Sequence, residues 1–313
     1  MMNLILYFST VLIWGTTWLA IAFQIGDAPV TLSVSYRFGL AAVVLMLLLV
    51  LKGVSLKISK KNHLFALSLG GFLFSTNFIC FYYATYYIPS GLNAVIFSLA
   101  PLLNAFNGWL FLRNTPDKRV IQGGIIGVIG VLLLFLPQIL STETNQLAIL
   151  GLFLSLAGTY CFSCGNFISS KAQSLQMPLL PTTAWGMAYG SGFLLILTVA
   201  IGNEISLPMD KDYLLSLLYL AIFGSVIGFN TYLLLVGRIG PQKAAYCTVL
   251  FPIIALMLST WFEGYKWEWP AVLGVVMVIM GNLRVFGIDS QWLNRYRLFR
   301  QRLVDRSSLK KPT

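Results

Sequence analysis

The sequence predicts an all-α polytopic membrane protein, in which ten transmembrane helices form two inverted five-helix repeats and both termini are cytoplasmic. Three observations lead to this fold class. The 313-residue chain is 58% hydrophobic and 10% charged, with a mean hydropathy of +0.80, whereas a soluble domain carries about 25% charged residues. Its apolar segments are long enough to cross a bilayer. A pattern of prolines and glycines also recurs in the second half of the chain.

The apolar segments are read as transmembrane helices, because a helix satisfies every backbone polar group within one segment. They cover residues 4–23, 30–51, 63–84, 91–112, 119–137, 148–170, 180–201, 213–236, 241–262 and 268–286. The connections are short, so no extramembrane domain fits between the segments. We therefore divide the chain into a first five-helix repeat (1–137), a second repeat (138–286) and a basic tail (287–313).

The internal repeat is clearest at residues that have special backbone roles. Laid over each other without a gap, residues 81–135 and 232–286 share identical residues at four positions of interest. These pairs are Ile88 with Ile239, Pro101 with Pro252, Gly123 with Gly274, and Gly130 with Gly281. Leucine matches are expected by chance in so apolar a chain, but proline and glycine each mark a special backbone position, so their matches are more informative. The sequence thus predicts a duplication.

The charged residues predict the orientation of the helices. Of the 21 Lys and Arg residues, 18 fall in or at the edges of alternate loops, or at and after the end of the last predicted helix, and the remaining loops hold most of the acidic residues. Basic loops are cytoplasmic in membrane proteins. Because each repeat has an odd number of helices, the second repeat enters the membrane inverted relative to the first. Inverted repeats are typical of transporters that bind substrate near the bilayer midplane.

The basic tail alternates charged and apolar residues. Apolar Trp292, Tyr296, Phe299 and Leu303 are spaced along one helical face, and Arg295, Arg302 and Arg306 fall off that face. This pattern predicts an interfacial amphipathic helix on anionic lipid; the alternative is a disordered basic tail that only fixes topology. The net charge of +11 is explained by the basic residues of the predicted cytoplasmic loops and of this tail. No nucleic-acid partner is therefore predicted.

Reactive side chains are scarce in the predicted spans, which argues against an enzyme. Membrane hydrolases need a nucleophile with a base, or paired acids that bind metal. The single histidine, His63, lies at a loop edge, and no Asp-x-x-Asp pattern falls within a span. The four cysteines, including Cys161 and Cys164, lie in apolar segments, so no disulfide, metal site or cofactor is predicted. The lack of midspan acids also argues against simple proton/cation antiport.

Arg37 is the one ionisable side chain that lies well inside a predicted span. Charged groups in the membrane are costly and are therefore candidates for function. Arg37 could hold a substrate carboxylate or phosphate in a central cavity. The alternative is that its side chain extends outward toward Asp27, or caps the helix carbonyls of a neighbouring span.

Pro101 and Pro252 lie near the centres of their spans. A proline inside a helix frees the carbonyl four residues earlier, here that of Phe97 and that of Thr248. Such carbonyls at the midplane bind ligands in transporters. We therefore predict that the two prolines line a cavity and act as bending points; the alternative is that they only kink helices for packing.

Aromatic residues and scattered amides elsewhere in the spans suit a small amphipathic solute, because they offer stacking faces and a few hydrogen bonds. With Arg37, the predicted substrate-binding residues are Trp14, Thr17, Asn77, Asn104, Tyr160, Asn166, Asn230 and Tyr246. Interhelical packing is the alternative for each one. A run of tyrosines is instead predicted to lie in the outer aromatic belt, namely Tyr82, Tyr83, Tyr86 and Tyr87.

Several motifs, in this order and spacing, resemble the ten-helix EamA-type transporters of the drug/metabolite transporter superfamily. They are Trp14-Gly15, Tyr36-Arg37-Phe38, the prolines Pro101 and Pro252, and the glycine spans opening at Gly123 and Gly274. The resemblance covers residues 4–286. It implies a bacterial inner-membrane carrier with a central cavity between two inverted repeats. The family usually has Gly-Glu just after spans four and nine; Glu263 fits that place in the second half, but the first half reads Leu112-Arg113.

The leading interpretation is a secondary carrier that exports a small polar or amphipathic metabolite, with an amino acid or a derivative as the expected solute. In this interpretation Arg37 attracts the carboxylate. Exchange or import of a nucleotide-like metabolite and multidrug efflux are the alternatives within transport, because family members differ in substrate. An ion channel is a further alternative, but inverted repeats with paired midspan prolines favour a carrier.

Overall fold

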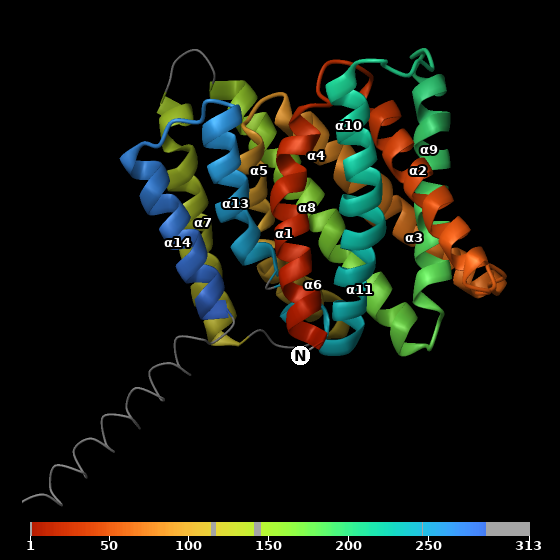
Figure 1. The fold of residues 1–313 in the computed structure, drawn as a ribbon. Coiled ribbons are helices and arrows are strands. Elements are labelled where there is room, and N and C mark those ends of the chain that lie inside the picture. The colour runs from red at the N-terminus through yellow and green to blue at the C-terminus, as the bar shows by residue number, and fades with distance from the viewer. Residues whose placement is uncertain (1, 114–116, 141–144, 246, 286–313) are drawn as a thin grey trace, which may run out of the picture.

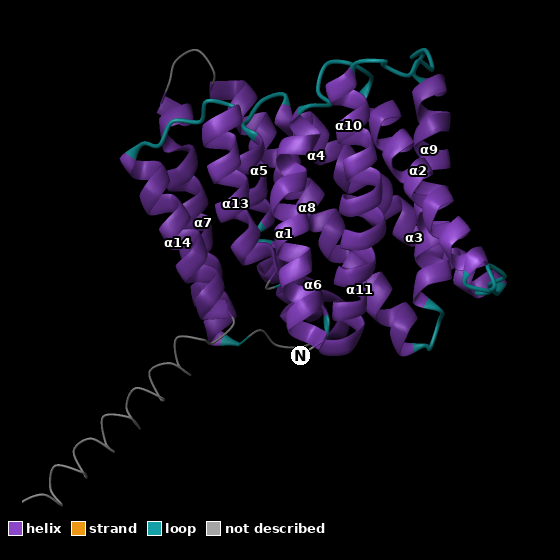
Figure 2. Ribbon diagram, viewed as in Figure 1, coloured by secondary structure: helices purple, strands orange, loops and turns teal. Residues whose placement is uncertain are grey.

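The computed structural model describes residues 2–113, 117–140, 145–245 and 247–285. Within these ranges every regular element is a helix and no β-strand occurs (Figure 2). Eight helical segments are long and apolar enough to cross a membrane, and two shorter apolar helices, Cys247–Phe262 and Trp269–Arg284, follow them. The predicted all-α polytopic membrane protein is therefore confirmed. The predicted tail helix (287–313) and Tyr246 lie outside the described residues.

The predicted apolar segments coincide with single helices or with runs of consecutive helices. The first half contains α1 (Met2–Ala22), α2 (Val30–Leu51), α3 (Lys60–Gly71), the π-helix η1 (Phe72–Thr76), α4 (Asn77–Thr85), α5 (Ser90–Phe97), α6 (Ala100–Leu112) and α7 (Lys118–Leu140). The second half contains α8 (Asn145–Ser174), α9 (Leu179–Ala200), α10 (Lys211–Tyr219), the π-helix η2 (Leu220–Ile227), α11 (Gly228–Ile239), α12 (Pro241–Ala244), α13 (Cys247–Phe262) and α14 (Trp269–Val285).

Short polar residues and glycines set several helix boundaries. The Ser59 hydroxyl accepts the backbone N–H of Asn62 at 3.2 Å and begins α3, and the Asp210 carboxylate accepts the N–H of Asp212 at 2.9 Å and begins α10. Both are typical N-caps, because they satisfy backbone donors that lack an intrahelical partner. Gly240, with φ of +84°, ends α11 and turns the chain into α12, a conformation that glycine adopts without strain.

A π-helix interrupts the same membrane segment in each half. η1 lies between α3 and α4, and η2 lies between α10 and α11. In each, a serine hydroxyl bonds back to the carbonyl five residues earlier: Ser75 to Gly70 at 2.8 Å, and Ser225 to Leu220 at 2.9 Å. π-Helical turns are rare and frequently mark functional sites. Neither π-helix was predicted from the sequence.

The two midspan prolines occupy different positions in their helices. The first segment is broken between α5 and α6, and Pro101 stands in the first turn of α6, where its missing N–H costs nothing. Pro252 instead lies inside α13, and the corresponding break precedes it, between α12 and α13. The prolines therefore align in sequence but only Pro101 marks the start of a new helix.

Paired glycines bring α7 and α14 into backbone contact. A Cβ atom on Gly274 would lie 2.5 Å from the carbonyl oxygen of Gly130, and one on Gly281 would lie 2.5 Å from that of Gly123. The aligned glycines of the two halves thus meet crosswise. These two helices form one side of the molecule, α2, α3 and α9 form the other, and α1, α4, α5, α8 and α13 lie between them (Figure 1).

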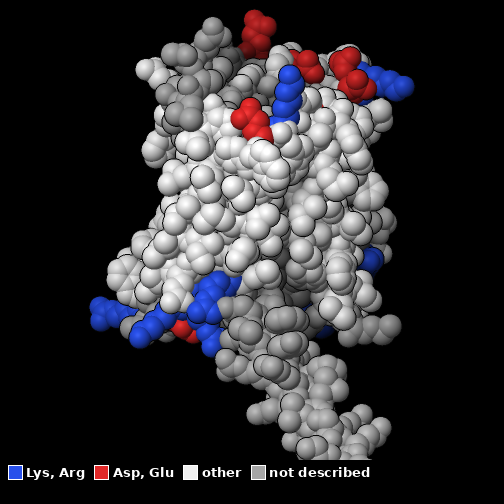
Figure 3. Space-filling model, turned by 90° about the vertical axis from the view of Figure 1, so that its left-hand side faces the viewer, with Lys and Arg blue, Asp and Glu red and all other residues white. Residues whose placement is uncertain are grey.

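Charged residues gather at the two ends of the helices and leave a wide uncharged belt between them (Figure 3). Acidic residues dominate the upper end in Figure 3, and basic residues dominate the lower end, from which the N-terminus of α1 starts in Figure 1. The belt carries exposed large hydrophobic side chains such as Leu47, Ile125 and Ile196. Such a belt suits contact with lipid.

Candidate functional site

The helices enclose a small cavity near the centre of the molecule. Its lining side chains are Trp14, Thr17, Trp18 and Ile21 of α1, Arg37 of α2, Asn77, Phe78 and Phe81 of α4, Phe97 of α5, Phe162 of α8, Phe229 of α11 and Phe251 of α13. The cavity leaves about 30 Å³ for the centres of water-sized spheres, which is room for about two water molecules. In this conformation the site is therefore closed around its own side chains.

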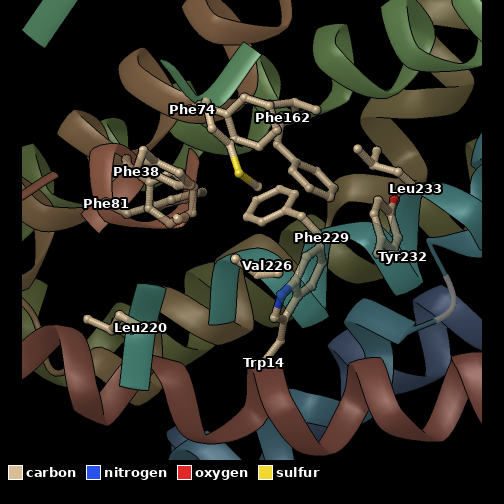
Figure 4. Close-up of a cluster of buried hydrophobic side chains, with 14 of the residues drawn as sticks. Trp14, Phe38, Phe74, Phe81, Phe162, Leu220, Val226, Phe229, Tyr232 and Leu233 are labelled. Carbon is tan, nitrogen blue, oxygen red and sulfur yellow. The ribbon is translucent and has the colours of Figure 1, made fainter. Parts of the chain in front are cut away.

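Aromatic rings from both halves of the chain pack against each other around the cavity. The ring of Trp14 lies 5.0 Å from that of Phe229 and 4.8 Å from that of Tyr232, and Figure 4 shows these rings converging. The rings of Phe97 and Phe162 are 4.5 Å apart. Tilted and edge-on contacts of this kind are favourable. These rings of Trp14, Phe97, Phe162, Phe229 and Tyr232, called the aromatic wall below, thus join the two halves of the chain.

The second π-helix positions Trp14 against this wall. The indole Nε1 of Trp14 donates a hydrogen bond of 3.2 Å to the carbonyl oxygen of Gly224 in η2. A Cβ atom on Gly228 would lie 2.6 Å from the same indole nitrogen. Glycine at the start of α11 is therefore what allows the ring to lie so close to the backbone.

Arg37 is only 1% exposed and lies between polar and aromatic groups. Its Nε donates a hydrogen bond of 3.0 Å to the hydroxyl of Ser225 in η2, and its guanidinium carbon lies 4.3 Å from the ring centre of Phe78. Its Nη1 is buried without a hydrogen-bond partner. Arg37 forms no ion pair with a carboxylate within the described residues. Its side chain points inward rather than toward Asp27, which is exposed.

Asn77 stands beside Arg37 in the lining and is also 1% exposed. Neither its amide nitrogen nor its amide oxygen has a hydrogen-bond partner. The Thr17 hydroxyl, by contrast, bonds to the carbonyl oxygen of Trp14 at 2.9 Å. Each unpaired buried polar atom costs about 1–3 kcal/mol. The cavity therefore contains donors and an acceptor whose hydrogen bonds are left for water or for a ligand.

Two buried tyrosines hydrogen-bond near the acidic end of the molecule. The hydroxyl of Tyr82 donates to Gln24 Oε1 at 2.7 Å, and the hydroxyl of Tyr213 lies 3.0 Å from that of Ser33. Tyr82 is fully buried, so the prediction that it belongs to the aromatic belt is wrong. Tyr83 and Tyr86 are exposed, as a belt requires. Periodicity could not separate Tyr82 from its neighbours because all four are tyrosines.

The other predicted binding residues that the structure describes do not line this cavity. Asn104 Oδ1 accepts the hydroxyl of Ser163 at 2.7 Å, and Asn104 Nδ2 donates to the carbonyl oxygen of Pro241 at 3.2 Å. Asn166 donates to the hydroxyl of Tyr232 at 3.0 Å. Asn230 Nδ2 bonds to the Val226 carbonyl oxygen at 2.6 Å, and the residue faces a separate apolar groove.

Tyr160 is half-buried and lies outside the lining. Of the predicted binding residues, the structure thus brings together Trp14, Thr17, Arg37 and Asn77. Sequence reasoning missed the phenylalanines of the wall, because a phenylalanine in an apolar span gives no signal that separates a cavity from packing. It also missed η2, which holds both Trp14 and Arg37.

A carboxylate from the second half contacts the first half at the acidic end. Oε1 of Glu263 accepts the backbone N–H of Ser90 at 3.2 Å, and Oε2 accepts the Ser90 hydroxyl at 2.5 Å. Ser90 begins α5, and a negative charge at a helix N-terminus is favourable. In the first half the ungapped alignment places Leu112 opposite Glu263, and the next residue, Arg113, ends α6 with φ of +54° and is exposed.

A bundle of long apolar helices with charge at both ends, closed around one central cavity, defines the class of multi-pass membrane transporters. The chain belongs to the EamA-like transporter family, whose model matches residues 1–136 and 149–286. The resemblance inferred from the motifs is therefore confirmed. Proteins of this family transport solutes and are not enzymes, and the same holds for this chain.

Similar proteins are transporters by name. The chain is 27% identical over 285 residues to the uncharacterized inner membrane transporter YedA of Escherichia coli K12, with 88% of this chain and 90% of that protein covered. It is 25% identical over 277 residues to the uncharacterized transporter YyaM of Bacillus subtilis, with the same coverage of each. It is 24% identical over 285 residues to a probable amino-acid metabolite efflux pump of Salmonella typhimurium, covering 88% and 92%.

The fold also has a solved relative. One crystal structure superimposes with a TM-score of 0.67 over 93% of this chain and 98% of the other, at 15% sequence identity. This likeness concerns the fold alone.

Proposed function

We propose that this protein is a secondary carrier of a bacterial inner membrane that exports an amino acid or an amino-acid derivative by alternating access. The names of two relatives, an inner membrane transporter and a probable amino-acid metabolite efflux pump, support the location and the solute class. The cavity supports the solute class independently, because its chemistry suits a small solute that has one carboxylate and an apolar part.

The observation that carries the proposal is the pair of unsatisfied polar groups inside the aromatic cavity. Arg37 Nη1 and both amide atoms of Asn77 are buried without partners. A guanidinium matches a carboxylate in shape and charge. The Asn77 oxygen can accept a hydrogen bond from an amino group, and the aromatic rings can contact the apolar part of the solute. Binding would then satisfy the groups that the empty site leaves unpaired.

The architecture proposed for this carrier has ten transmembrane helices in two inverted repeats, with both termini in the cytoplasm. Three features support it. Gly123 faces Gly281 while Gly130 faces Gly274, which is the exchange that a two-fold relation between repeats requires. A π-helix interrupts the same segment of each half. Basic and acidic residues gather at opposite ends, and basic ends are cytoplasmic.

Alternating access would open this cavity to one side at a time. Its two-water volume is too small for an amino acid, so loading requires that the halves move apart. We propose that Pro101 and Pro252 provide the bending points. Asn104, Tyr160, Asn166, Asn230 and Tyr246 are proposed to contact the solute only after such an opening.

The test is a thermal-shift screen of the purified protein against amino acids, their derivatives, nucleotides and lipophilic cations. A solute at a hundredfold its dissociation constant adds about 2.7 kcal/mol of stability. Carboxylate solutes should stabilise the wild type. They should stabilise Arg37→Lys less strongly, because lysine keeps the charge but loses the planar guanidinium that binds a carboxylate with two hydrogen bonds. Arg37→Gln should abolish the effect, and Lys211→Gln, which removes an exposed charge, should preserve it.

The screen can also contradict the proposal. Stabilisation only by lipophilic cations, unchanged in Arg37→Gln, would indicate multidrug efflux through the aromatic walls. Stabilisation by nucleotides but not by amino acids would indicate a nucleotide-like substrate. Counter-transport of labelled solute in proteoliposomes distinguishes a carrier from a channel, because only a carrier shows it.

A further inference from the structure

Two depressions meet at Val54, on the surface at the basic end of the molecule. The first, of about 450 Å³, is an apolar groove between the beginnings of α1 and α9 and the side of α11, with walls formed mainly by Leu6, Leu179, Leu180 and Leu234. The second, of about 780 Å³, is open and includes Lys57 and His63. Val54 belongs to both linings, so the two depressions adjoin each other at this residue.

The second depression, which contains Lys57 and is called the basic depression below, is held in shape by side chains of α9. Trp185 Nε1 donates a hydrogen bond of 3.0 Å to the carbonyl oxygen of Leu56, which fixes the loop between α2 and α3. The hydroxyl of Tyr189 lies 2.7 Å from His63 Nδ1, and its ring stacks on that of Trp185. This loop reaches out at the lower right of Figure 1. The depression is therefore a built feature of the fold.

The charge around the basic depression has one sign. The loop and the first turn of α3 carry four lysines, Lys52, Lys57, Lys60 and Lys61, and all four are exposed. The sequence contains no Asp or Glu between residues 28 and 116 or between residues 145 and 203. These stretches include α2, α3, α9 and the loop itself. The lysines thus have no acidic partner on the elements that form the depression.

We propose that these two adjoining depressions together bind an anionic phospholipid of the leaflet at the basic end of the protein. The phosphate would lie in the depression beside Lys57, and an acyl chain would lie in the groove between Leu6, Leu180 and Leu234. Basic pockets between transmembrane helices on the cytoplasmic side bind anionic head groups. A free phosphate would leave the apolar groove unexplained. This site is separate from the central cavity, and the proposal does not depend on which solute the cavity binds.

Lipid binding at this site would fix one arrangement of three elements. The groove walls come from α1, α9 and α11, and two of these helices also line the central cavity through Trp14 and Phe229. An acyl chain between them would therefore stabilise the packing that closes the cavity. The expected result is that the protein is more stable to heat with anionic lipid than without it.

The experiment titrates the full-length protein, purified in a neutral detergent, with phosphatidylglycerol, phosphatidylcholine or glycerol phosphate. Bound lipids are counted by native mass spectrometry and the thermal midpoint is measured. Phosphatidylglycerol should bind and stabilise more strongly than phosphatidylcholine, and glycerol phosphate should do neither. Lys57→Gln should weaken phosphatidylglycerol binding about fivefold, because a basic side chain near anionic lipid contributes about 1 kcal/mol. Lys118→Gln, at the same end on α7, should not.

A second variant tests the apolar part of the site. Leu234→Trp should fill the groove and weaken both phospholipids, without changing the response to a carboxylate solute in the central cavity. Equal binding of the two phospholipids, with no effect of Lys57→Gln, would overturn the proposal. Stabilisation by glycerol phosphate as strong as that by phosphatidylglycerol would also overturn it and indicate a site for free phosphate.

Discussion

The Nε atom of Arg37 donates a 3.0 Å hydrogen bond to the hydroxyl of Ser225, which belongs to the π-helix of the other half of the chain. Arg37 is the one charged side chain that is buried within the described part of the molecule. Its position therefore depends on both halves. A movement that separates α2 from η2 must either break this hydrogen bond or carry the guanidinium with it.

Removing the Ser225 hydroxyl tests this relationship. Ser225→Ala should lower the free energy of unfolding by about 1–3 kcal/mol, because the buried Nε loses its partner, and should change the affinity for carboxylate solutes. Ser75→Ala is the matched control, because Ser75 makes the equivalent backbone bonds in η1 without contacting Arg37. Thermal unfolding and solute titration measure both effects. Equal changes in affinity for the two variants would contradict the assigned role.

The glycine contact between α7 and α14 predicts a size limit. Gly274→Ala should destabilise the protein strongly, because its Cβ would lie 2.5 Å from the Gly130 carbonyl oxygen and 2.7 Å from the Leu134 nitrogen. Backbone atoms cannot turn aside as side chains do, so the helices must separate. Gly192→Ala in α9 meets open space and should be neutral or stabilising by up to about 1 kcal/mol. The thermal midpoints in detergent check both, and two similar midpoints would refute the contact.

The Glu263 contact with Ser90 predicts a measurable electrostatic effect. Glu263→Gln keeps an acceptor but removes the charge at the N-terminus of α5, so stability should fall by about 0.5–1 kcal/mol. Glu204→Gln, in an exposed loop at the same end, should have little effect. Denaturant unfolding of the two variants compares them. No difference between them would show that the carboxylate charge is unimportant at this helix.

Tyr265 predicts a loss of stability at alkaline pH. It is buried in the loop between α13 and α14, its hydroxyl has no hydrogen-bond partner, and burial together with the nearby Glu268 raises its pKa to about 12. An unfolded tyrosine has a pKa of about 10. The neutral phenol therefore contributes full stability below pH 10, which is lost as the pH rises toward 12, by about 1.4 kcal/mol at pH 11.

The matched variant for this prediction is Tyr265→Phe. It should lack that part of the alkaline loss, and at pH 7 it should be as stable as the wild type or more so, because the phenol oxygen is unpaired. Tyrosinate absorbance followed against pH, with thermal midpoints at each pH, provides the measurement. An identical alkaline loss in the variant would assign the effect to other groups.

Sequence reasoning was most reliable where one residue type stands out from its surroundings. Arg37 was found because a charge inside an apolar span is expensive, and the helices were found because apolar length is a direct requirement of the bilayer. The aligned glycine pairs predicted the duplication, but the crosswise contacts that these glycines make between α7 and α14 were not predicted. The sequence predicted a bending point at each midspan proline, whereas the structure breaks the first segment between α5 and α6, next to Pro101, and the second between α12 and α13, several residues before Pro252.

The amides show what a sequence cannot reveal. Asn77, Asn104 and Asn166 look alike in apolar segments, yet the structure leaves Asn77 without a partner in the cavity and bonds the other two to side chains elsewhere. The difference depends on helix rotation and on which helix lies opposite. A π-helix changes the direction in which the following side chains of the same segment point. No residue type in η1 or η2 distinguishes these segments from an ordinary α-helix in the sequence.

The isolated positive charge of Arg37 has an electrical consequence for the proposed cycle. A charge that crosses the whole membrane field changes its energy by about 2.3 kcal/mol per 100 mV. If the halves rock, the water-filled entrance moves from one side of Arg37 to the other, so the guanidinium changes its place in the field even if it hardly moves. The empty carrier would then respond to membrane voltage, and a bound anion would cancel that response. Transient currents in planar bilayers, recorded with and without solute, would reveal this difference directly.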